Sequence, residues 1–330
     1  MMKKIKVGLI GAGSITRKHL DVIKDIDDIE AVAITSRTRK KAENLASEYG
    51  IAICVDSLDS LIKEAQLDAL MVLVSADQIY EVTSKAIPYG LPLFIEKPPG
   101  LTPSDTKKLA ALAKEHSVPN MVGFNRRFYS IFAKGLEIIR AHGPLLGVEI
   151  QGHERMWLRA ARLSEKDRYH WIFSNSTHTI DLLRFFGGEP ESISSLAHKY
   201  IEPRGDQFSV QMELNSGAIG HYSAYWYSPG GWSVVLYGYG VTVEYKPLEA
   251  GRWTDKNFVI HDIEPDEVDR AYKPGFFRQM QAFIKLVRNR VSQWPMLDLE
   301  GAYKTMALAE QMSSNVSDKR EAINSQTKTI

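Results

Sequence analysis

Three polar residues, Ser174, His178 and Asp181, are spaced by four and then three positions in the segment WIFSNSTHTIDLLRF, residues 171–185. If the segment is an α-helix, their side chains share one face, because residues three and four apart are neighbours on a helix. A histidine with polar neighbours one turn away in each direction could exchange a proton with a substrate. An ordinary hydrogen-bonded histidine near a helix start fits the same pattern, so the rest of the chain must supply a reaction that needs it.

A second candidate for chemistry is the glycine turn in GLIGAGSIT, near the start of the chain. Gly11 and Gly13 form a G-x-G pattern between an apolar run and a helical pattern, with Ser14 and Ile15 in the same turn. Gly11 permits a tight turn, and Gly13 lets a pyrophosphate approach the backbone at the positive end of the helix. The third motif position is Thr16 rather than glycine or alanine, so the motif is incomplete. Its place in the first strand–helix unit favours dinucleotide binding over a purely structural turn.

The stretch ITSRTRKK, at the end of the second expected strand, bears on the choice of nicotinamide cofactor. An acid there would bond the ribose 2′-hydroxyl and repel the 2′-phosphate of NADP. No acid is present, and Ser36, Arg37 and Thr38 offer two hydroxyls and a guanidinium instead. A solvated helix start is the alternative, although basic residues in a first turn oppose the helix dipole. The pattern favours NADP, with NAD possible.

Lys97 stands at the end of another apolar run, in FIEKPPG. The two prolines after it stiffen the chain and restrict where the side chain points. At the carboxyl end of a parallel strand, where doubly wound proteins bind ligands, a partly desolvated lysine could bond a reacting hydroxyl or carbonyl and share in proton transfer. A surface lysine beside a loop is the alternative.

The first half of the chain alternates patterns typical of strands and helices. Short apolar runs rich in β-branched residues predict buried parallel strands, and amphipathic segments between them predict helices. Repeated units of this kind, with short connections, predict a doubly wound parallel sheet. The expected strands are KIKVGLI, EAVAIT, IAICV, DALMVLV, LPLFIEK and VPNMVGF.

After Asn125 the pattern changes. FYSIFAKGLEIIRAHG predicts one long helix, and LLGVEIQGHERMW an extended strand. QFSVQMEL, GAIGHYSAYWY and GWSVVLYGYG predict neighbouring strands of a largely antiparallel sheet. Helices around Phe276–Asn289 and Leu299–Met312 are expected to close the chain. The expected fold is therefore α/β over residues 1–124, followed by α+β over residues 125–330.

Composition narrows the classes of function. A chain of 330 residues is long enough for roughly two domains. The net charge of +1, without a long run of one sign, argues against general nucleic-acid binding. The single cysteine, Cys54, excludes an internal disulfide and a multi-cysteine zinc site, and no metal site is predicted. The start MMKKIKVGLIGAGS is short and broken by glycine, which favours a buried strand over a signal peptide. No stretch approaches the ~18 apolar residues of a membrane span, so we expect a cytoplasmic protein.

Together these motifs resemble the Gfo/Idh/MocA family of glucose–fructose oxidoreductases and inositol dehydrogenases. The Glu-Lys-Pro signature of that family matches Glu96, Lys97 and Pro98, and the similarity extends through VGFNRRF, STHTIDLLRFFGG and FFRQMQAFIKLV. The resemblance implies a Rossmann domain, then a domain with an open-faced sheet, an NAD or NADP cofactor, and a sugar, cyclitol or related substrate. It also implies Lys97 and His178 as catalytic residues, with Glu96 beside the cofactor.

The chain departs from the family pattern at Ser174. The family usually has an aspartate there, one turn before the catalytic histidine. A serine cannot carry the negative charge that would raise the pKa of a neighbouring histidine or lysine. Three alternatives follow: Lys97 and His178 work alone, another side chain such as Tyr169 or His170 replaces the aspartate, or the chain binds cofactor without turnover.

A second departure is VSADQIY, where the family often has Asn-Pro and a later histidine. Ser75 and Tyr80 stand there instead. This loop is expected near the nicotinamide, so Ser75 joins the candidate cofactor residues.

The segment GHERMWLRAARLSEKDRYHW, residues 152–171, is the candidate substrate segment. Guanidinium groups pair with carboxylate or phosphate, and aromatic faces such as those of Trp157 and Tyr169 suit sugar rings. An anionic sugar, such as a uronate or a nucleotide-linked sugar, would fit; a solvated, salt-bridged loop over packed aromatics is the alternative. Arg127 is a further candidate, as a substrate contact or a domain-interface residue, and Ser174 and His178 complete the substrate-binding set.

The predicted second sheet points to a partner chain. SAYWY and WSVVLYG carry large apolar groups at both odd and even positions, whereas a sheet with one wet face would alternate more cleanly. We therefore expect one face to pack on helices and the other on a second copy, giving a dimer or tetramer. Scattered surface aromatics are the alternative.

These residues predict an oxidoreductase that prefers NADP and moves a hydride between nicotinamide C4 and a secondary alcohol carbon of a sugar-like substrate. Lys97 would orient the oxygen and relay its proton, and His178 would act as general acid or base. A nucleotide-sensing regulator, which keeps the cofactor site without efficient chemistry, is the competing class. The serine at position 174 favours it, and the presence of Lys97 and His178 argues against it.

Overall fold

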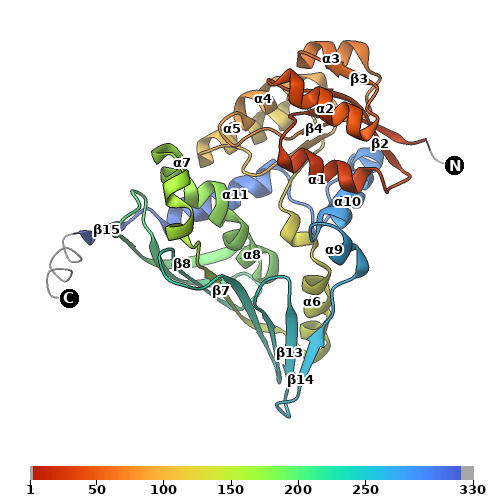
Figure 1. The fold of residues 1–330 in the computed structure, drawn as a ribbon. Coiled ribbons are helices and arrows are strands. Elements are labelled where there is room, and N and C mark those ends of the chain that lie inside the picture. Colours follow the sequence, from red (N-terminus) through yellow and green to blue (C-terminus); the bar gives the residue numbers. More distant parts are fainter. Residues whose placement is uncertain (1–2, 321–330) are drawn as a thin grey trace. The chain divides into compact units, whose positions relative to one another are not determined.

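The computed structural model describes residues 3–320 and divides the chain into two compact units (Figure 1). The first unit is Met1–Phe128 with Glu267–Lys304, and the second is Tyr129–Asp266 with Thr305–Ile330. The sequence places one boundary at residue 124 and leaves everything after it in the second domain. The structure instead groups residues 267–304 with the first unit. Residues 321–330 of the expected second domain lie outside the described part.

The first unit contains a six-stranded, wholly parallel sheet in the order β3-β2-β1-β4-β5-β6. This order belongs to a doubly wound Rossmann sheet, whose strand order reverses between β1 and β4. The strands are β1 (Ile5–Ile10), β2 (Ile29–Thr35), β3 (Ile53–Val55), β4 (Ala69–Val72), β5 (Leu93–Ile95) and β6 (Asn120–Val122). The helices between them are α1 (Ser14–Ile23), α2 (Arg39–Tyr49), α3 (Leu58–Glu64), α4 (Ile79–Ala86) with η1 (Ile87–Tyr89), and α5 (Pro103–Glu115).

Side chains alternate between the two faces of this sheet, as the period of two in a strand requires. Val7 and Leu9 of β1 join one apolar cluster with α1 and α2. Ile10 of the same strand joins a second cluster with α3, α4 and α5. Because both faces are covered by helices, the strands read as nearly continuous apolar runs in the sequence.

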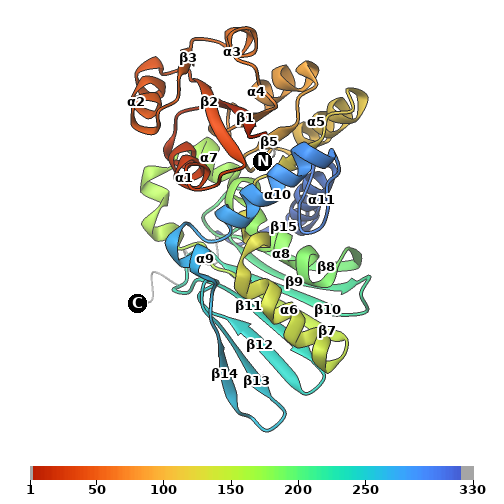
Figure 2. The same cartoon turned by 90° about the vertical axis from the view of Figure 1, so that its right-hand side faces the viewer.

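Helix α10 (Phe276–Asn289) explains why a late segment belongs to the first unit. Its buried residues, among them Phe276, Met280 and Phe283, share a cluster with Phe94 of β5 and Met121 of β6. The helix packs beside α1 and against β6 (Figure 2). It thereby covers the part of that face that the helices between the strands leave open. The short helix α9 (Glu267–Ala271) precedes it, and α11 (Leu299–Met312) begins in the first unit and ends in the second.

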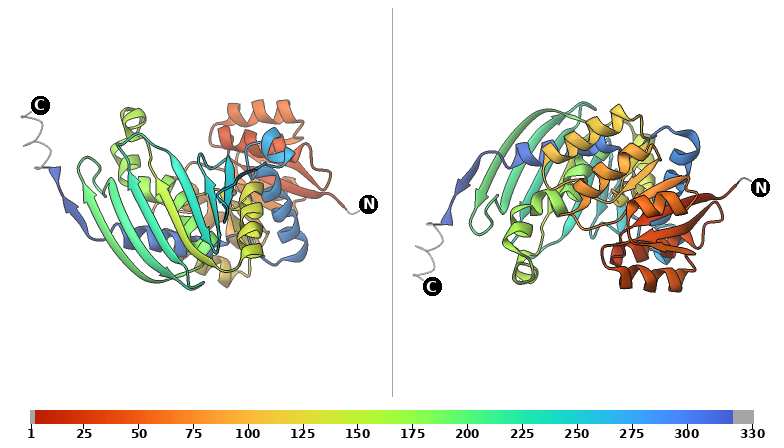
Figure 3. Two further views of the ribbon diagram at one scale, coloured as in Figure 1. Left: turned by 90° about the horizontal axis from the view of Figure 1, so that it is seen from below. Right: turned by 90° about the horizontal axis from the view of Figure 1, so that it is seen from above.

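The second unit is built on a nine-stranded sheet in the order β14-β13-β12-β11-β7-β10-β9-β8-β15 (Figure 3). The pairs β7–β10 and β8–β15 are parallel and the other pairs are antiparallel. The strands are β7 (Leu145–Gly152), β8 (Pro190–Lys199), β9 (Gln207–Leu214), β10 (Ile219–Tyr225), β11 (Trp232–Gly238), β12 (Val241–Tyr245), β13 (Gly251–Asp255), β14 (Ile260–Ile263) and β15 (Val316–Asp318).

Two expectations about these strands are wrong. β10 and β11 are not neighbours, because β7 lies between them and pairs with both. The strand expected over residues 145–157 ends at Gly152, and short turns follow it: η3 (Met156–Leu158), η4 (Ala160–Arg162) and α7 (Glu165–Tyr169). The apolar Met156 is buried from a 3-10 turn rather than from a strand, which residue type alone does not distinguish.

Helices cover one face of the second sheet. α6 (Ser130–His142) packs against β11 to β14, and α8 (Thr177–Gly187) against β7 and β10. β9 alternates cleanly, with Phe208, Val210, Met212 and Leu214 buried and the residues between them exposed. The other face exposes several large side chains, namely Leu196, Ile219, Tyr225 and Tyr237. Association with a second copy through this face stays a prediction.

Among residues 3–320, no helix is long and apolar enough to cross a membrane.

Candidate functional site

The turn between β1 and α1 requires glycine at position 11. Gly11 has φ +114°, which L side chains rarely adopt, and a Cβ there would collide with the carbonyl oxygen of Leu73. Its N–H donates to Thr35 O at 2.8 Å, which ties the turn to β2. Gly13 differs, because nothing lies within 4 Å of the Cβ that it lacks. The backbone at Gly13 is therefore open to an approaching group.

Thr16 takes the place of the third motif glycine without disturbing the turn. It is fully buried, and its Oγ1 donates to Gly11 O at 3.1 Å, joining helix and turn. No side chain caps α1, and its first turn carries no acid. The first N–H groups of this ten-residue helix are thus available to an anion. Ser14 and Ile15 are its first two residues, beside Gly13.

The two glycines give a pair of variants with opposite expected effects. Gly11→Ala should lower the free energy of unfolding by at least about 1–3 kcal/mol, because of its backbone conformation and the collision with Leu73. Gly13→Ala should change it by less than about 0.5 kcal/mol, since its Cβ meets open space, yet should weaken cofactor binding by blocking the backbone. Urea unfolding and a cofactor titration separate the two effects. Tight cofactor binding by Gly13→Ala would contradict the assignment of this turn.

The end of β2 presents basic and hydroxyl groups to solvent. Arg37 and Thr38 are exposed, and the Thr38 N–H contacts Ser36 Oγ at 3.4 Å. Arg39 pairs with Glu43 and Asp56, the latter just after β3, so its charge is balanced locally. The Arg37 side chain is exposed, so its guanidinium is accessible to a ligand.

Lys97 is the second residue after β5, and its backbone is held by the neighbouring Glu96. The Glu96 carboxylate is 6% exposed, accepts the Lys97 backbone N–H at 3.1 Å, and contacts His19 Nε2 at 2.8 Å. His19 lies on the buried side of α1, between the rings of Phe94 and Phe276. Gly123 leaves room for the carboxylate, since a Cβ there would lie 3.2 Å from it. The Glu96 side chain therefore faces the interior of the unit and links Lys97 to α1; a cofactor contact for it stays a prediction.

The parallel sheet brings several candidates to one edge. Gly11, Ser36, Ser75 and Lys97 follow the carboxyl ends of β1, β2, β4 and β5, and the carboxyl ends of parallel strands meet at the same edge. Ser75 is exposed, and its carbonyl accepts the N–H groups at the start of α4. This edge includes the place between β1 and β4 where the strand order reverses, which is where ligands bind in such sheets. Arg127, in η2 (Asn125–Phe128) just after β6, is buried.

His178 and Ser174 belong to the second unit and are not in one continuous α-helix. Residues Ile172–Ser176 form a π-helical turn, labelled η5, and α8 begins at Thr177. A π turn closes i→i+5 hydrogen bonds rather than i→i+4, so the expected α-helical spacing between Ser174 and His178 does not hold. Such turns are frequent at functional sites, and nothing in the residue types alone signals this one.

The start of α8 is held by side chains on both sides of His178. Thr177 Oγ1 donates to Phe173 O and Thr179 Oγ1 to Ser176 O, both at 2.9 Å. His178 itself is 6% exposed, with its ring centroid 6.0 Å from that of Trp232 on β11. This histidine is therefore presented from a rigid helix start.

Asp181 has a structural environment. Its carboxylate is 1% exposed, accepts Thr305 Oγ1 at 2.8 Å, and lies 3.8 Å from Arg184 Nη1. Arg184 also pairs with Glu189. These bonds join α8 to the middle of α11 and account for a buried acid at this position.

The candidate substrate segment is partly solvated and partly fixed by ion pairs. Trp157 is 43% and Tyr169 39% exposed. Arg204 lies 4.5 Å above the Tyr169 ring and donates to its hydroxyl, and Arg168 pairs with the buried Glu202. His170 Nδ1 contacts Lys166 O at 2.9 Å. The two side chains that the sequence offers as replacements for the missing aspartate thus make local contacts of their own.

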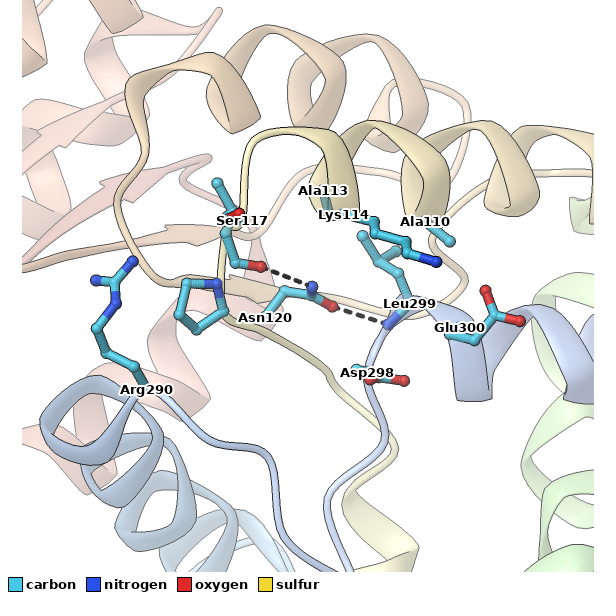
Figure 4. A pocket seen from close by; sticks show the side chains of 11 residues that line it. Ala110, Ala113, Lys114, Ser117, Asn120, Arg290, Asp298, Leu299 and Glu300 are labelled. Carbon is cyan, nitrogen blue, oxygen red and sulfur yellow. Dashed lines mark hydrogen bonds between the residues drawn. The ribbon is translucent and has the colours of Figure 1, made fainter.

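A hollow of about 700 Å³ in the first unit lies at the opposite edge of the sheet (Figure 4). It opens at the amino end of β6, where Asn120 donates to Val118 O at 3.1 Å and accepts the Leu299 N–H at 2.8 Å. The Asn120 amide therefore joins the segment before β6 to the start of α11. Because ligands of doubly wound sheets bind at the carboxyl ends, this hollow is not the candidate site. Among residues 3–320, no three His, Cys, Asp or Glu could together hold a metal ion.

Comparison with known families decides the relationship. Residues 5–124 match the family model described as "Oxidoreductase family, NAD-binding Rossmann fold", and residues 143–244 match the Gfo/Idh/MocA C-terminal domain. The chain belongs to the Gfo/Idh/MocA family. It is therefore an oxidoreductase with an NAD-binding Rossmann domain, and the fold expected from the sequence is confirmed.

Relatives within the Gfo/Idh/MocA family include two inositol dehydrogenases. Inositol 2-dehydrogenase of Rhizobium meliloti (strain 1021) is 28% identical over 220 residues, which cover 65% of this chain and 66% of that protein. The scyllo-inositol 2-dehydrogenase (NAD(+)) of Bacillus subtilis (strain 168) is 24% identical over 308 residues and 88% of each chain. A crystal structure of an Agrobacterium radiobacter oxidoreductase, in complex with NAD+, L-tartaric acid and magnesium, has a TM-score of 0.81 at 17% identity, covering 95% of this chain and 97% of that one. The similarity to this crystal structure is one of fold alone.

Proposed function

We propose that this protein is a dehydrogenase that prefers NADP and interconverts a secondary alcohol and a ketone on a sugar-like substrate. The observation that carries the proposal is the position of Lys97. It follows β5 at the sheet edge that also holds the open Gly13 turn, and its backbone is fixed by a buried Glu96. A lysine so placed can bond an oxygen that gains or loses a proton during the reaction.

The proposed roles follow from the environments of the two candidate side chains. The bound nicotinamide supplies or accepts the hydride. Lys97 orients the reacting oxygen and stabilises the charge that develops on it. His178, held in a buried helix start, exchanges the proton with that oxygen as general acid or base.

The substrate class rests on two lines of support. Relatives of this chain include inositol dehydrogenases, which favours a cyclitol or sugar carbon as the hydride donor. The exposed Trp157 and Tyr169, with Arg204 over the Tyr169 ring, favour a ring that carries an anionic group, such as a uronate or a nucleotide-linked sugar. Arg127 and Ser174 remain proposed substrate contacts.

The proposal is tested by a screen of cyclitols, neutral sugars, uronates and nucleotide sugars with either oxidised cofactor. Turnover is read from the absorbance of the reduced nicotinamide. We expect oxidation of at least one compound with a ring hydroxyl, and faster turnover for anionic members. Activity confined to simple aliphatic alcohols would contradict the substrate class.

A separate prediction concerns cofactor choice. NADP(H) should bind more tightly than NAD(H), because Arg37 is available for the 2′-phosphate and Ser36 and Thr38 add hydroxyl donors. Arg37→Ala should weaken NADP(H) binding on the order of 10–100-fold, as expected for loss of a charged hydrogen bond, with little change for NAD(H). Tryptophan fluorescence titrations measure both affinities.

The control for Arg37 is Lys114→Ala, which removes an exposed cation at the opposite edge of the sheet. It should leave both affinities unchanged. Equal wild-type affinities for the two cofactors, or tighter NAD(H), would refute the phosphate assignment. Association through the second sheet and a cytoplasmic location remain predictions, for which sedimentation and cell fractionation are the measurements.

A further inference from the structure

A buried carboxylate, Glu154, lies beside the π turn that precedes His178. Glu154 follows β7 by two residues and is 3% exposed. Its Oε2 accepts Asn175 Nδ2 at 2.5 Å, and its Oε1 accepts Ser176 Oγ at 2.6 Å. The two oxygens thus bind two consecutive residues at the end of the turn. The turn is therefore held by a hydrogen-bond acceptor, the Glu154 carboxylate, from a different part of the chain.

The burial of Glu154 carries a desolvation cost. Burial raises the pKa of the Glu154 carboxyl, and the hydrogen bonds from Ser176 and Asn175 oppose that rise. Tyr222 on β10 is also fully buried nearby, and Arg159 is the cation that lowers the same pKa. A buried acid is retained against this cost only where its bonds are well formed, as they are here.

The same turn leads directly into His178. The Ser176 hydroxyl donates to Glu154, and the Ser176 carbonyl accepts the Thr179 hydroxyl. Thr179 Oγ1 also lies 3.3 Å from the Tyr222 hydroxyl. Gly152 permits this arrangement, since a Cβ there would collide with that hydroxyl. Ser176 and Thr179, on either side of His178, are therefore bonded to the segment after β7 and to β10. A shift of Glu154 would move the helix start that carries the histidine.

We propose that Glu154 is a positioning residue for His178, acting through Asn175 and Ser176 of the π turn. Its carboxylate reaches the histidine only through these two residues, from the segment that follows β7. The inference rests on the proposed function for the catalytic role of His178. The hydrogen bonds of Glu154 are observed independently of that function.

Three variants test the proposal. Glu154→Met removes both acceptors and should lower kcat on the order of 10²-fold, the expected cost of misplacing a catalytic group by about 1 Å, with KM and cofactor affinity nearly unchanged. Glu154→Gln keeps an acceptor for Asn175 and a partner for Ser176, so it should recover most of the rate. Ser176→Ala removes one bond with little change in volume, and should fall between them. Glu191→Gln, which removes an exposed carboxylate in the same unit, is the matched control.

A second readout does not depend on turnover. The imidazole resonance of His178, identified by its loss in His178→Asn, should move in Glu154→Met and Ser176→Ala but not in Glu191→Gln. An unmoved resonance with kcat within about twofold of wild type would overturn the proposal. So would a Glu154→Met protein whose only change is a lower Tm. If the wild type turns over no compound, the proposed function fails, and the resonance alone decides the role of Glu154.

Discussion

Lys97→Met is expected to abolish nearly all turnover, by a factor on the order of 10³ or more, while the cofactor still binds. Methionine keeps the length of the side chain but removes the ammonium group that would bond the reacting oxygen. The backbone bond from residue 97 to Glu96 does not involve the side chain and should survive the change. Steady-state rates on the substrate found in the screen, with fluorescence titration of NADP(H), measure the two effects.

The control for this change is Lys108→Met on the exposed side of α5. It removes the same charge from the same unit and should leave rate and affinity unchanged. A Lys97→Met enzyme that keeps more than about a tenth of the wild-type rate would contradict the catalytic role, since removing one group that stabilises the developing charge costs about 10²–10³.

His178→Asn is expected to cost on the order of 10²–10⁴ in rate, the usual contribution of a general acid–base group. Asparagine keeps a hydrogen-bonding side chain of similar reach but cannot exchange a proton near neutral pH. The comparison is Ser174→Ala, which should cost much less, because a serine can only hydrogen-bond or cap the turn. Steady-state rates of both variants measure the two losses, with circular dichroism as a control for folding.

The comparison has two informative outcomes. A loss from Ser174→Ala as large as that from His178→Asn would make the serine a working part of proton transfer. If the wild type turns over no sugar, cyclitol or nucleotide sugar, a nucleotide-sensing protein becomes the better description.

The parallel sheet could be predicted because local and tertiary preferences agree there. The strands of the first unit are short apolar runs, and the glycine turn and Lys97 both follow such runs directly. Residues that follow parallel strands meet at one edge whatever the details of packing. The sequence therefore suffices to place the glycine turn and Lys97 at the same edge of the sheet.

The contacts that hold the candidate catalytic residues could not be predicted. His19 and Glu96 are 77 positions apart, and Glu154 and Ser176 are 22 apart. No periodicity connects such pairs. His19 gave one weak signal, as a polar residue on the buried side of α1. The π turn at Ile172–Ser176 gave none, and the carboxylate that accepts bonds from its last two residues, Glu154, lies earlier in the chain.

Helix α10 has a consequence for how the chain acquires its structure during synthesis. Phe94 and Met121 belong to an apolar cluster that is completed by Phe276, Met280 and Phe283. A nascent chain that ends near residue 128 would therefore display part of that apolar surface, which invites aggregation. The Rossmann unit can close only after the whole intervening sheet unit has left the ribosome. An isolated cofactor-binding fragment should for the same reason need residues 267–304 restored, as a fused or co-expressed segment, before it remains in solution.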